Sequence, residues 1–391
     1  SERSSFAVIE LKNLYKSYRG KSVLMNISLT IQDNEFFVLI GSSGCGKTTL
    51  LKTLNKLNPI DKGEILINGT PINRIKVTQL PRLMGYVVQE GGLFPHMTVE
   101  DNIALAMRVA GYPKEKIYDR ITELLELVNL EPDQYRSQYP SQLSGGQRQR
   151  IGVARAFAAD PEIILMDEPF SALDPMTRAE LQDEVHRLQL RFHKTIVFVT
   201  HDMDEAVKLA DRICILQNGH VVQCDKPENI LKHPANEYIN SFIGKNRLWE
   251  NPSFIRAEDI MRPRPITISQ SRTVVQAVQL MRHYNIDSLL VTGDDNKFAG
   301  MVWLQDLIGI DQYSSPVSSF LSDDYLSVRV DDSLSTVLEK VADYGEKDFG
   351  ILPVLDAEGA IRGFLNRSSL LSTLSRRFID EPVERDEQEG A

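Results

Sequence analysis

The sequence is poor in cysteine, tryptophan and long apolar runs. Its 391 residues include three cysteines and two tryptophans. The cysteines, Cys45, Cys214 and Cys224, are odd in number and show no metal-ligand spacing, so the simplest interpretation is a reducing, cytoplasmic setting. No signal peptide is evident, and no apolar run approaches the roughly 18–20 residues that a membrane-spanning helix needs. We therefore expect that the chain does not cross a membrane itself, and that a partner must hold it if it works at one.

The sequence also lacks the excess of basic residues that nucleic-acid binding requires. Its formal net charge is −10, and its pI is about 5.3. This acidic balance argues against a dedicated nucleic-acid binder. With 42% hydrophobic and 25% charged residues, the composition is that of an ordinary soluble globular protein. The length favours two or three domains.

The most informative stretch fits the phosphate-loop pattern G-x-x-x-x-G-K-[ST]. Residues 36–40 before it are typical of a buried strand, and residues 49–54 after it are typical of a helix, which is the context that the pattern needs. Its glycines allow a tight turn whose N–H groups point at phosphate oxygens, and the helix N-terminus adds partial positive charge. Lys47 can bridge the β- and γ-phosphates, and the Thr48 hydroxyl can ligate Mg²⁺. The stretch consists of Gly41, Ser42, Ser43, Gly44, Cys45, Gly46, Lys47 and Thr48.

Two adjacent carboxylates follow a second apolar strand. Residues 163–166 form a four-residue apolar run that ends at Asp167 and Glu168. Asp167 can hold Mg²⁺ through its water shell, and Glu168 can polarise an attacking water. The alternative is a solvated acidic turn, which the preceding apolar strand makes the weaker interpretation.

Two further strands each deliver one polar residue. Residues 85–88 lead to Gln89, and residues 195–200 lead to His201. A glutamine at such a strand tip can touch both Mg²⁺ and the attacking water, although alone it is more often a solvated loop residue. A histidine at the carboxyl edge of a sheet can sense a γ-phosphate, although a lone histidine usually has no such role.

The chain contains a second anion-binding turn and an aromatic candidate for base stacking. A Ser-Gly-Gly turn opens a predicted helix after Leu143, and a helix N-terminus of this kind attracts anions. Tyr18 lies just before the polar turn 19–21 and can stack on an adenine ring, although a tyrosine packed on a strand edge is an equally good interpretation. Asp174 continues the loop after Glu168, and Pro175 suits the first turn of the next helix.

The chain repeats itself after a boundary near residue 250. Each copy reads as strand, helix, strand, turn, strand, and matching positions lie about 60–64 residues apart, as a tandem of β-α-β-β-α units predicts. We predict a linker over 246–254, one repeat over 255–313 and a second over 314–375. The acidic tail, 376–391, is expected to be disordered.

The order in which these motifs follow one another along residues 6–245 closely resembles the nucleotide-binding subunit of ATP-binding cassette (ABC) transporters. The stretch Leu-Ser-Gly-Gly-Gln at 143–147 is that family's own signature. The resemblance implies an α/β fold with a P-loop, RecA-like core, an antiparallel β subdomain and a helical subdomain. It also implies a homodimer whose copies face head to tail, with ATP between the phosphate loop of one copy and the signature of the other.

The resemblance further implies a role for each site residue. Glu168 is the catalytic carboxylate, with His201, Gln89 and Lys47 acting beside it at the γ-phosphate. Mg²⁺ is served by Thr48, Gln89 and Asp167. The nucleotide is bound by Tyr18, Gly41, Ser42, Ser43, Gly44, Cys45, Gly46, Lys47, Thr48, Thr49, Ser144, Gly145, Gly146, Gln147 and Asp174. The segment after Gln89 that contains Phe94, Pro95 and His96 is where the transmembrane partner docks a short helix.

Residues 255–374 resemble a tandem of cystathionine-β-synthase-type (CBS) domains. An ABC subunit with this suffix is similar to the ATPase of bacterial osmoprotectant importers, which carry glycine betaine, choline or carnitine. This implies transmembrane permease subunits, an extracellular substrate-binding protein or domain, and a peripheral position at the cytoplasmic membrane face. The alternatives are an importer of a different small solute and a soluble, non-transport ABC ATPase.

The CBS resemblance departs from its pattern at the nucleotide contacts. The family's Gly-x-apolar-Thr-x-x-Asp stretch has Trp303 in place of Thr in the first copy, and the second copy, 363–369, lacks both Thr and Asp. The sequence therefore does not predict the family's usual contacts to AMP or ATP. The module is expected to bind a cyclic dinucleotide, to sense ionic strength through charge, or to serve only as a dimerising element.

Overall fold

The chain divides into two compact units, residues 1–243 and 244–391. The structure, a computed structural model, describes residues 7–89, 92–244, 251–293, 295–308, 313–345 and 349–375. Residues 245–250, which include the first part of the predicted linker 246–254, and the whole acidic tail, 376–391, lie outside the described residues. Within the described ranges, no helix is long and apolar enough to cross a membrane.

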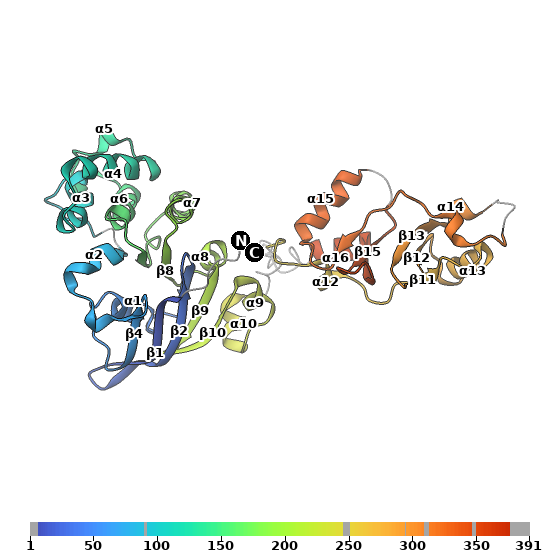
Figure 1. Ribbon diagram of the computed structural model, residues 1–391, viewed down its shortest axis with the longest axis horizontal. Helices are drawn as coiled ribbons and strands as arrows, with labels where there is room; N and C mark the ends of the chain where they lie inside the picture. The colour runs from blue at the N-terminus through green and yellow to red at the C-terminus, as the bar shows by residue number, and fades with distance from the viewer. Residues whose placement is uncertain are drawn as a thin grey trace, which may run out of the picture. The chain divides into compact units, whose positions relative to one another are not determined.

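A six-stranded sheet with the order β10-β9-β3-β8-β7-β6 is the centre of the first unit (Figure 1). All of its pairings are parallel except that of β10 with β9. Every residue of β3, β7 and β8 is buried, because helices or the second sheet cover both faces, and this burial explains their continuous apolar sequences. The strands are β3 (Phe36–Ile40), β6 (Met84–Val87), β7 (Ile163–Asp167), β8 (Thr195–Thr200), β9 (Arg212–Gln217) and β10 (His220–Asp225).

A four-stranded antiparallel sheet with the order β2-β1-β4-β5 packs beside the central sheet. In β2 the burial alternates along most of the strand, as expected for a strand with one face in the core. Its apolar residues share one core with β3, β7, β8 and β9. The strands are β1 (Ala7–Tyr18), β2 (Lys21–Gln32), β4 (Lys62–Ile67) and β5 (Thr70–Pro71).

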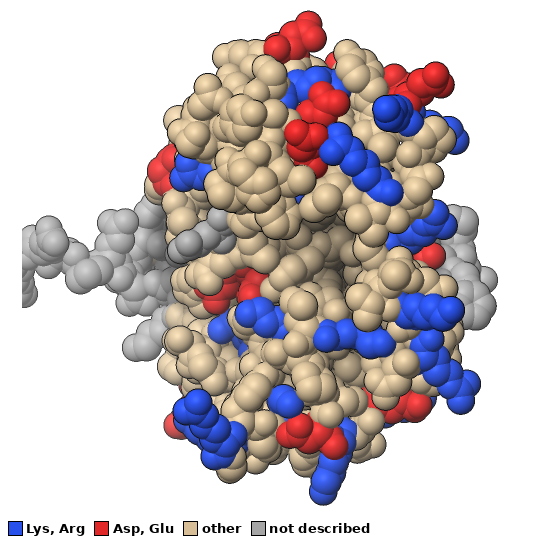
Figure 2. Space-filling view, turned by 90° about the vertical axis from the view of Figure 1, so that its left-hand side faces the viewer, with Lys and Arg blue, Asp and Glu red and all other residues tan. Residues whose placement is uncertain are grey.

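A helical segment, α3 to α6, lies at the end of this unit opposite β1 and β4 (Figure 1). Thr98, Ser144 and Asp174 cap α3, α6 and α7 by accepting hydrogen bonds from backbone N–H groups in the first turn. A recess separates the helical segment from the part below it on the face in Figure 2. The helices are α1 (Lys47–Leu54), α2 (Leu80–Leu83), α3 (Val99–Val109), α4 (Lys114–Leu127), α5 (Pro132–Tyr135), α6 (Gly145–Ala158), α7 (Pro175–Phe192), α8 (Met203–Leu209), α9 (Pro227–Lys232) and α10 (Glu237–Ile243).

The second unit contains two three-stranded sheets, β11-β12-β13 and β14-β15-β16. In each, the first pairing is parallel and the second antiparallel, so the predicted tandem of β-α-β-β-α units is confirmed. Each sheet has its own apolar core. The elements are α12 (Ala257–Ile260), β11 (Thr267–Ser269), α13 (Val274–Tyr284), β12 (Ser288–Thr292), β13 (Phe298–Trp303), α14 (Leu304–Leu307), β14 (Val328–Arg329), α15 (Leu334–Tyr344), β15 (Ile351–Leu355), β16 (Ile361–Asn366) and α16 (Arg367–Ser375).

The start of the second unit packs on its second repeat rather than its first. Ile255 and Ala257 are buried in the core of β14-β15-β16, and the Ala257 N–H donates to the Asp332 carbonyl oxygen at 2.8 Å. The following backbone at Arg262 exchanges hydrogen bonds with Phe364 of β16. The sequence pattern assigns this segment to the first repeat, because it precedes the first repeat along the chain.

Candidate functional site

The predicted phosphate loop connects β3 to α1 at the carboxyl end of the central sheet. Close approach requires two of its glycines. A Cβ atom at Gly41 would lie 2.2 Å from the Leu216 carbonyl oxygen, and one at Gly46 would lie 2.9 Å from the Val23 carbonyl oxygen. Gly46 also has a φ of +112°, which residues with a side chain rarely adopt. The loop therefore lies directly on neighbouring backbone, and its exposed part is Ser42, Ser43 and Gly44.

Lys47 is held against the loop that precedes it. Its side chain is buried, with 5% of the residue exposed. The ammonium donates to the carbonyl oxygens of Gly41 at 2.8 Å and Ser42 at 3.1 Å. Nζ therefore lies over the concave side of the turn, where phosphate oxygens would replace these carbonyl oxygens as acceptors.

Thr48 and Asp167 meet across the end of the sheet. The Thr48 hydroxyl donates to Asp167 Oδ1 at 2.8 Å, and the Tyr86 hydroxyl donates to Oδ2 at 3.4 Å. Burial and the neighbouring Asp167 charge raise the pKa of Tyr86 well above its usual range, so Tyr86 stays a hydrogen-bond donor. No cluster of three or more His, Cys, Asp or Glu side chains that could hold a metal occurs among the described residues. Mg²⁺ does not need one, because it binds through one or two protein oxygens, waters and phosphates, and this pair of oxygens fits it.

Glu168 and His201 also contact each other. His201 Nδ1 lies 3.0 Å from Glu168 Oε2, and both residues directly follow the ends of adjacent parallel strands, β7 and β8. Glu168 has a left-handed backbone with φ of +45°, and its N–H donates to the Val199 carbonyl oxygen at 3.0 Å. Its side chain is 20% exposed and that of His201 is 59% exposed, so both remain open to a ligand at this edge. A carboxylate held beside an imidazole can accept a proton from water.

Gln89 lies two residues beyond β6 and is exposed, at the same edge of the sheet. Asn102, which is fully buried, holds the loop at residues 94–98 in place. The Asn102 side chain accepts from the Phe94 N–H at 2.7 Å and donates to three carbonyl oxygens of residues 94–98. Phe94, a residue that is 42% exposed, therefore lies on a fixed loop.

The signature stretch opens α6 with a reciprocal cap. Ser144 Oγ accepts from the Gln147 N–H at 3.2 Å, while Gln147 Oε1 accepts from the Ser144 N–H at 2.8 Å. A Cβ atom at Gly146 would lie 2.7 Å from Thr177 Cγ2 of α7, so the small residue allows the two helices to approach closely. Among the described residues, no hydrogen bond joins 144–147 to the phosphate loop. The Ser144 hydroxyl proton and the N–H groups of the helix N-terminus can therefore donate hydrogen bonds to a ligand that is not bound in this chain's own phosphate loop.

Asp174 lies at the start of a helix, and Tyr18 lies at the end of a strand of the antiparallel sheet. Asp174 caps α7 and accepts from the Thr177 N–H at 3.1 Å; its hydrogen bonds with Thr177 lower its pKa. Tyr18 ends β1 and is 43% exposed, with Lys16 Nζ 5.0 Å from its ring centroid. An exposed ring of this kind is available for stacking.

Two tyrosines support the site and were not identified from the sequence. Tyr86 contacts Asp167 from the neighbouring strand, and Tyr135 accepts from Gln147 Nε2 at 3.0 Å. The sequence could have indicated Tyr86, because it lies three residues before Gln89 on a strand beside β7. It could not have indicated Tyr135, because the contact of Tyr135 depends on the fold of the helical segment.

Comparison with known proteins identifies the family. Residues 24–171 match the family described as ABC transporter, and residues 257–311 and 317–376 match the CBS domain. The choline transport ATP-binding protein OpuBA of Bacillus subtilis is 44% identical over 93% of this chain and 95% of its own length.

The chain belongs to the ATP-binding subunits of ABC transporters, which hydrolyse ATP. Other similar proteins include the carnitine transport ATP-binding protein OpuCA of Listeria monocytogenes, 40% identical over 93% of this chain and 91% of its own. The osmoprotectant import ATP-binding protein OsmV of Salmonella typhimurium is 36% identical over 94% of this chain and 96% of its own. The predicted α/β fold with a P-loop cassette and a CBS tandem is thereby confirmed.

A solved ABC cassette matches a little over half of this chain. The dimeric structure of MJ0796, a bacterial ABC transporter cassette, has a TM-score of 0.52 and 33% identity, and it matches 56% of this chain and 98% of its own. The same cassette is known in a dimeric, post-hydrolysis state bound to ADP and Pi.

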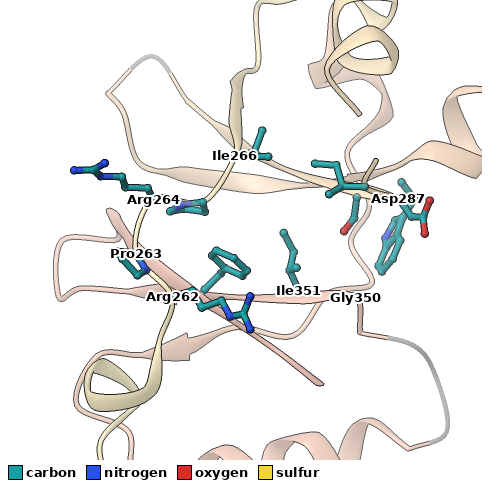
Figure 3. Close-up of a pocket in the computed structure, with 12 residues that line it drawn as sticks. Arg262, Pro263, Arg264, Ile266, Asp287, Gly350 and Ile351 are labelled. Atoms are coloured by element: carbon teal, nitrogen blue, oxygen red, sulfur yellow. The ribbon is translucent and has the colours of Figure 1, made fainter. Parts of the chain in front are cut away.

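The ABC subunit also has a cleft within its CBS unit (Figure 3). The cavity has a volume of about 410 Å³, and it is lined by residues 262–266, by Asp287 at the start of β12, and by Gly350 and Ile351 at the start of β15. Trp303 closes one side of it. A Cβ atom at Gly350 would lie 2.8 Å from the indole ring, so the ring packs directly on this backbone. Arg262 and Arg264 are exposed basic residues of its lining, and in Figure 3 the Arg264 side chain points away from the other lining residues.

Proposed function

We propose that this subunit powers the import of quaternary-amine osmoprotectants such as glycine betaine, choline or carnitine. The observation that carries the proposal is similarity over more than nine-tenths of the chain, CBS tandem included, to proteins whose names specify transport of choline, carnitine and glycine betaine. The substrate pocket lies in other chains, so an importer of a different small solute is the competing proposal.

In this proposal, two copies of the chain sandwich two ATP molecules. The phosphate loop of one copy, residues 41–49, binds the phosphates with Lys47, and Tyr18 stacks on adenine. The other copy supplies 144–147 and Asp174. Support comes from the helix cap at Ser144, which has no hydrogen-bond link to the phosphate loop of its own chain, and from the dimeric form of the related cassette.

Hydrolysis is proposed to use the residues at the strand ends. Mg²⁺ would be held by Thr48, Gln89 and Asp167, and it would supply charge neutralisation at the phosphates. Glu168 accepts the proton of the attacking water, while His201, 3.0 Å from it, orients the carboxylate and contacts the γ-phosphate. The fixed positions of Lys47 and Asp167 keep the reacting groups in register.

The partners are proposed to be transmembrane permease subunits and an extracellular substrate-binding protein or domain. The segment that holds Phe94, Pro95 and His96 is the proposed docking place for a short permease helix. Support comes from the Asn102 hydrogen bonds that fix this segment and from the exposure of Phe94. This arrangement would hold the subunit at the cytoplasmic face of the membrane as a peripheral protein.

The CBS tandem is proposed to regulate the ATPase. The cleft beside Arg262 and Arg264 favours an anionic ligand, and Trp303 stands at the position where the CBS pattern has its threonine. A cyclic dinucleotide is therefore the proposed ligand class. Charge-based sensing of ionic strength and a dimerising role alone are the alternatives.

The deciding experiment for the transport proposal is ATP hydrolysis by the subunit reconstituted in liposomes with its permease and binding protein. Glycine betaine, choline and carnitine are added one at a time. Stimulation by a quaternary amine supports the substrate class and ranks its members. Intact basal hydrolysis without a response to any of the three rejects the substrate class and retains the ABC ATPase.

A separate titration tests the regulatory ligand. A cyclic dinucleotide is titrated into the full chain by calorimetry, alongside the Arg262→Ala variant. Saturable binding that weakens in the variant supports a ligand site in the cleft. No binding, combined with hydrolysis in liposomes that changes with salt concentration, favours ionic-strength sensing instead.

A further inference from the structure

Two of the three cysteines lie opposite each other in the sheet that carries the phosphate loop. Cys214 of β9 and Cys224 of β10 are cross-strand partners in the antiparallel register. Cys214 belongs to the apolar core that the two sheets share, Cys224 packs against that core, and each thiol shifts the pKa of the other. Directly opposed residues in antiparallel strands have Cβ atoms about 4.5–5.5 Å apart, just beyond the usual disulfide separation of about 3.5–4.5 Å.

A fixed guanidinium lies against this thiol pair. Arg212 Nη2 donates to Cys224 Sγ at 3.2 Å. Arg212 is held in place because its Nη1 also donates to Glu35 Oε1 at 3.1 Å and its guanidinium lies 5.3 Å from the Phe37 ring centroid. The hydrogen bond from Cys214 and the Arg212 charge lower the pKa of Cys224 to about 7. Cys224 is thus substantially thiolate at neutral pH, which is the nucleophilic form.

The two thiols differ in access. Cys214 is fully buried, whereas Cys224 lies on the edge strand of the sheet and is only partly buried. A small oxidant therefore meets Cys224 first, and Cys214 is the thiol already in contact with it. This is the arrangement of an attacking cysteine and a resolving cysteine.

We propose that Cys214 and Cys224 form a reversible intramolecular disulfide when the protein meets a hydroperoxide. The Cys224 thiolate attacks the peroxide, an S–O bond forms, the O–O bond breaks, and an alcohol or water leaves. The Cys214 thiol then attacks the sulfenic sulfur, the S–S bond forms, and the oxygen departs as water. Two thiols lose two electrons, and the hydroperoxide gains them.

The disulfide would act on the strand that supports the phosphate loop. Cys214 pairs in register with Leu39 of β3, two residues before Gly41. Two residues further along β9 lies Leu216, whose carbonyl oxygen is close to Gly41 of the phosphate loop. A dithiol reduces a disulfide by thiol–disulfide exchange, which makes the modification reversible.

Peptide mapping of the full chain tests this inference. Trypsin leaves both cysteines in one peptide, 213–232, because the Lys226–Pro227 bond resists cleavage, while Cys45 falls in another peptide and serves as an internal control. After hydrogen peroxide and iodoacetamide at pH 7, peptide 213–232 should carry no alkyl group and should weigh two hydrogens less. Dithiothreitol should restore both alkylation sites. Cys45, whose pKa is raised by burial, should react with peroxide about ten times more slowly than Cys224, or more slowly still.

Single variants assign the roles of the two thiols. Cys224→Ser should abolish the reaction, whereas Cys214→Ser should leave a sulfenic acid at Cys224 that dimedone traps. The wild-type map stands on its own if the buried Cys214 variant does not fold. Peptide 213–232 that stays fully alkylatable after peroxide, or an oxidised chain that runs as a disulfide-linked dimer on a non-reducing gel, would overturn the proposal.

Discussion

The ATP-binding unit and the CBS unit differ in how their polar side chains are arranged. In the first unit, the groups at the strand ends are already joined in pairs, as in Thr48 with Asp167 and Glu168 with His201. In the second unit, the cleft has exposed arginines on one side and an indole packed on glycine backbone on another. The first unit is therefore built for one reaction with fixed geometry, whereas the second offers a cavity whose chemistry departs from its own family's pattern.

The sharpest test of the first unit is Glu168→Gln. Removing the proposed proton acceptor should lower ATP turnover by about 10²–10⁴-fold while nucleotide binding persists. Turnover is measured by phosphate release, and binding by a fluorescent ATP analogue. The matched control is Glu64→Gln, exposed on β4, which should retain turnover. Normal turnover in Glu168→Gln would reject the assignment.

Lys47→Ala should weaken nucleotide binding. A hydrogen bond to a charged group contributes about 1.5–3 kcal/mol, so Kd should rise roughly 10–150-fold. Equilibrium titration with an ATP analogue measures this change, and Lys52→Ala, on the same helix, is the control. An unchanged Kd for Lys47→Ala would count against the phosphate-loop assignment. The first unit would then no longer differ from the CBS unit in having a site of fixed geometry.

Trp303→Ala tests whether the second unit depends on the ring that lines its cleft. The half-buried indole packs on Gly350, so its removal should destabilise this unit by about 1–3 kcal/mol. Hydrogen exchange should quicken in β12, β13 and β15 and stay unchanged in β3, β7 and β8. Trp303→Phe, which keeps a ring, should have the smaller effect. Equal acceleration in both units would show that they do not unfold independently.

The smallest expected effect concerns Asp61 beside Tyr18. Hydrogen bonds from Lys16 Nζ at 3.0 Å and the Ser17 N–H at 2.6 Å lower the pKa of Asp61 below its usual value. Since the folded pKa is the lower one, its stabilisation is present above the unfolded pKa of about 3.9 and is lost as pH falls through the folded pKa. Asp61→Asn should therefore lower Tm at pH 6 and lower it by a smaller amount near pH 3. An equal loss at both values would contradict a charge-based role.

Sequence patterns predicted the strand ends of the first unit well. The phosphate loop, the carboxylates and His201 each follow a short apolar run, and parallel strands bring such ends to one edge. The pairing of Thr48 with Asp167 depends on which strands are neighbours, which local sequence does not encode. The contact of Tyr135 with Gln147 likewise depends on the helical segment's tertiary packing.

The second unit shows a different limit of prediction. Its repeat period gave the β-α-β-β-α order, but the packing of Ile255 and Ala257 on the later repeat crosses the repeat boundary. No periodicity reveals such an exchange. Trp303 was visible as a departure from pattern, whereas its contact with Gly350, which has φ of +58°, required the fold.

The two carbonyl acceptors of Lys47 have a thermodynamic consequence for nucleotide binding. Because the ammonium is already withdrawn from water in the ligand-free chain, the unfavourable free energy of its dehydration belongs to folding. Binding ATP is then an exchange of acceptors, carbonyl oxygen for phosphate oxygen. The affinity measures the difference between these two sets of contacts rather than the strength of either.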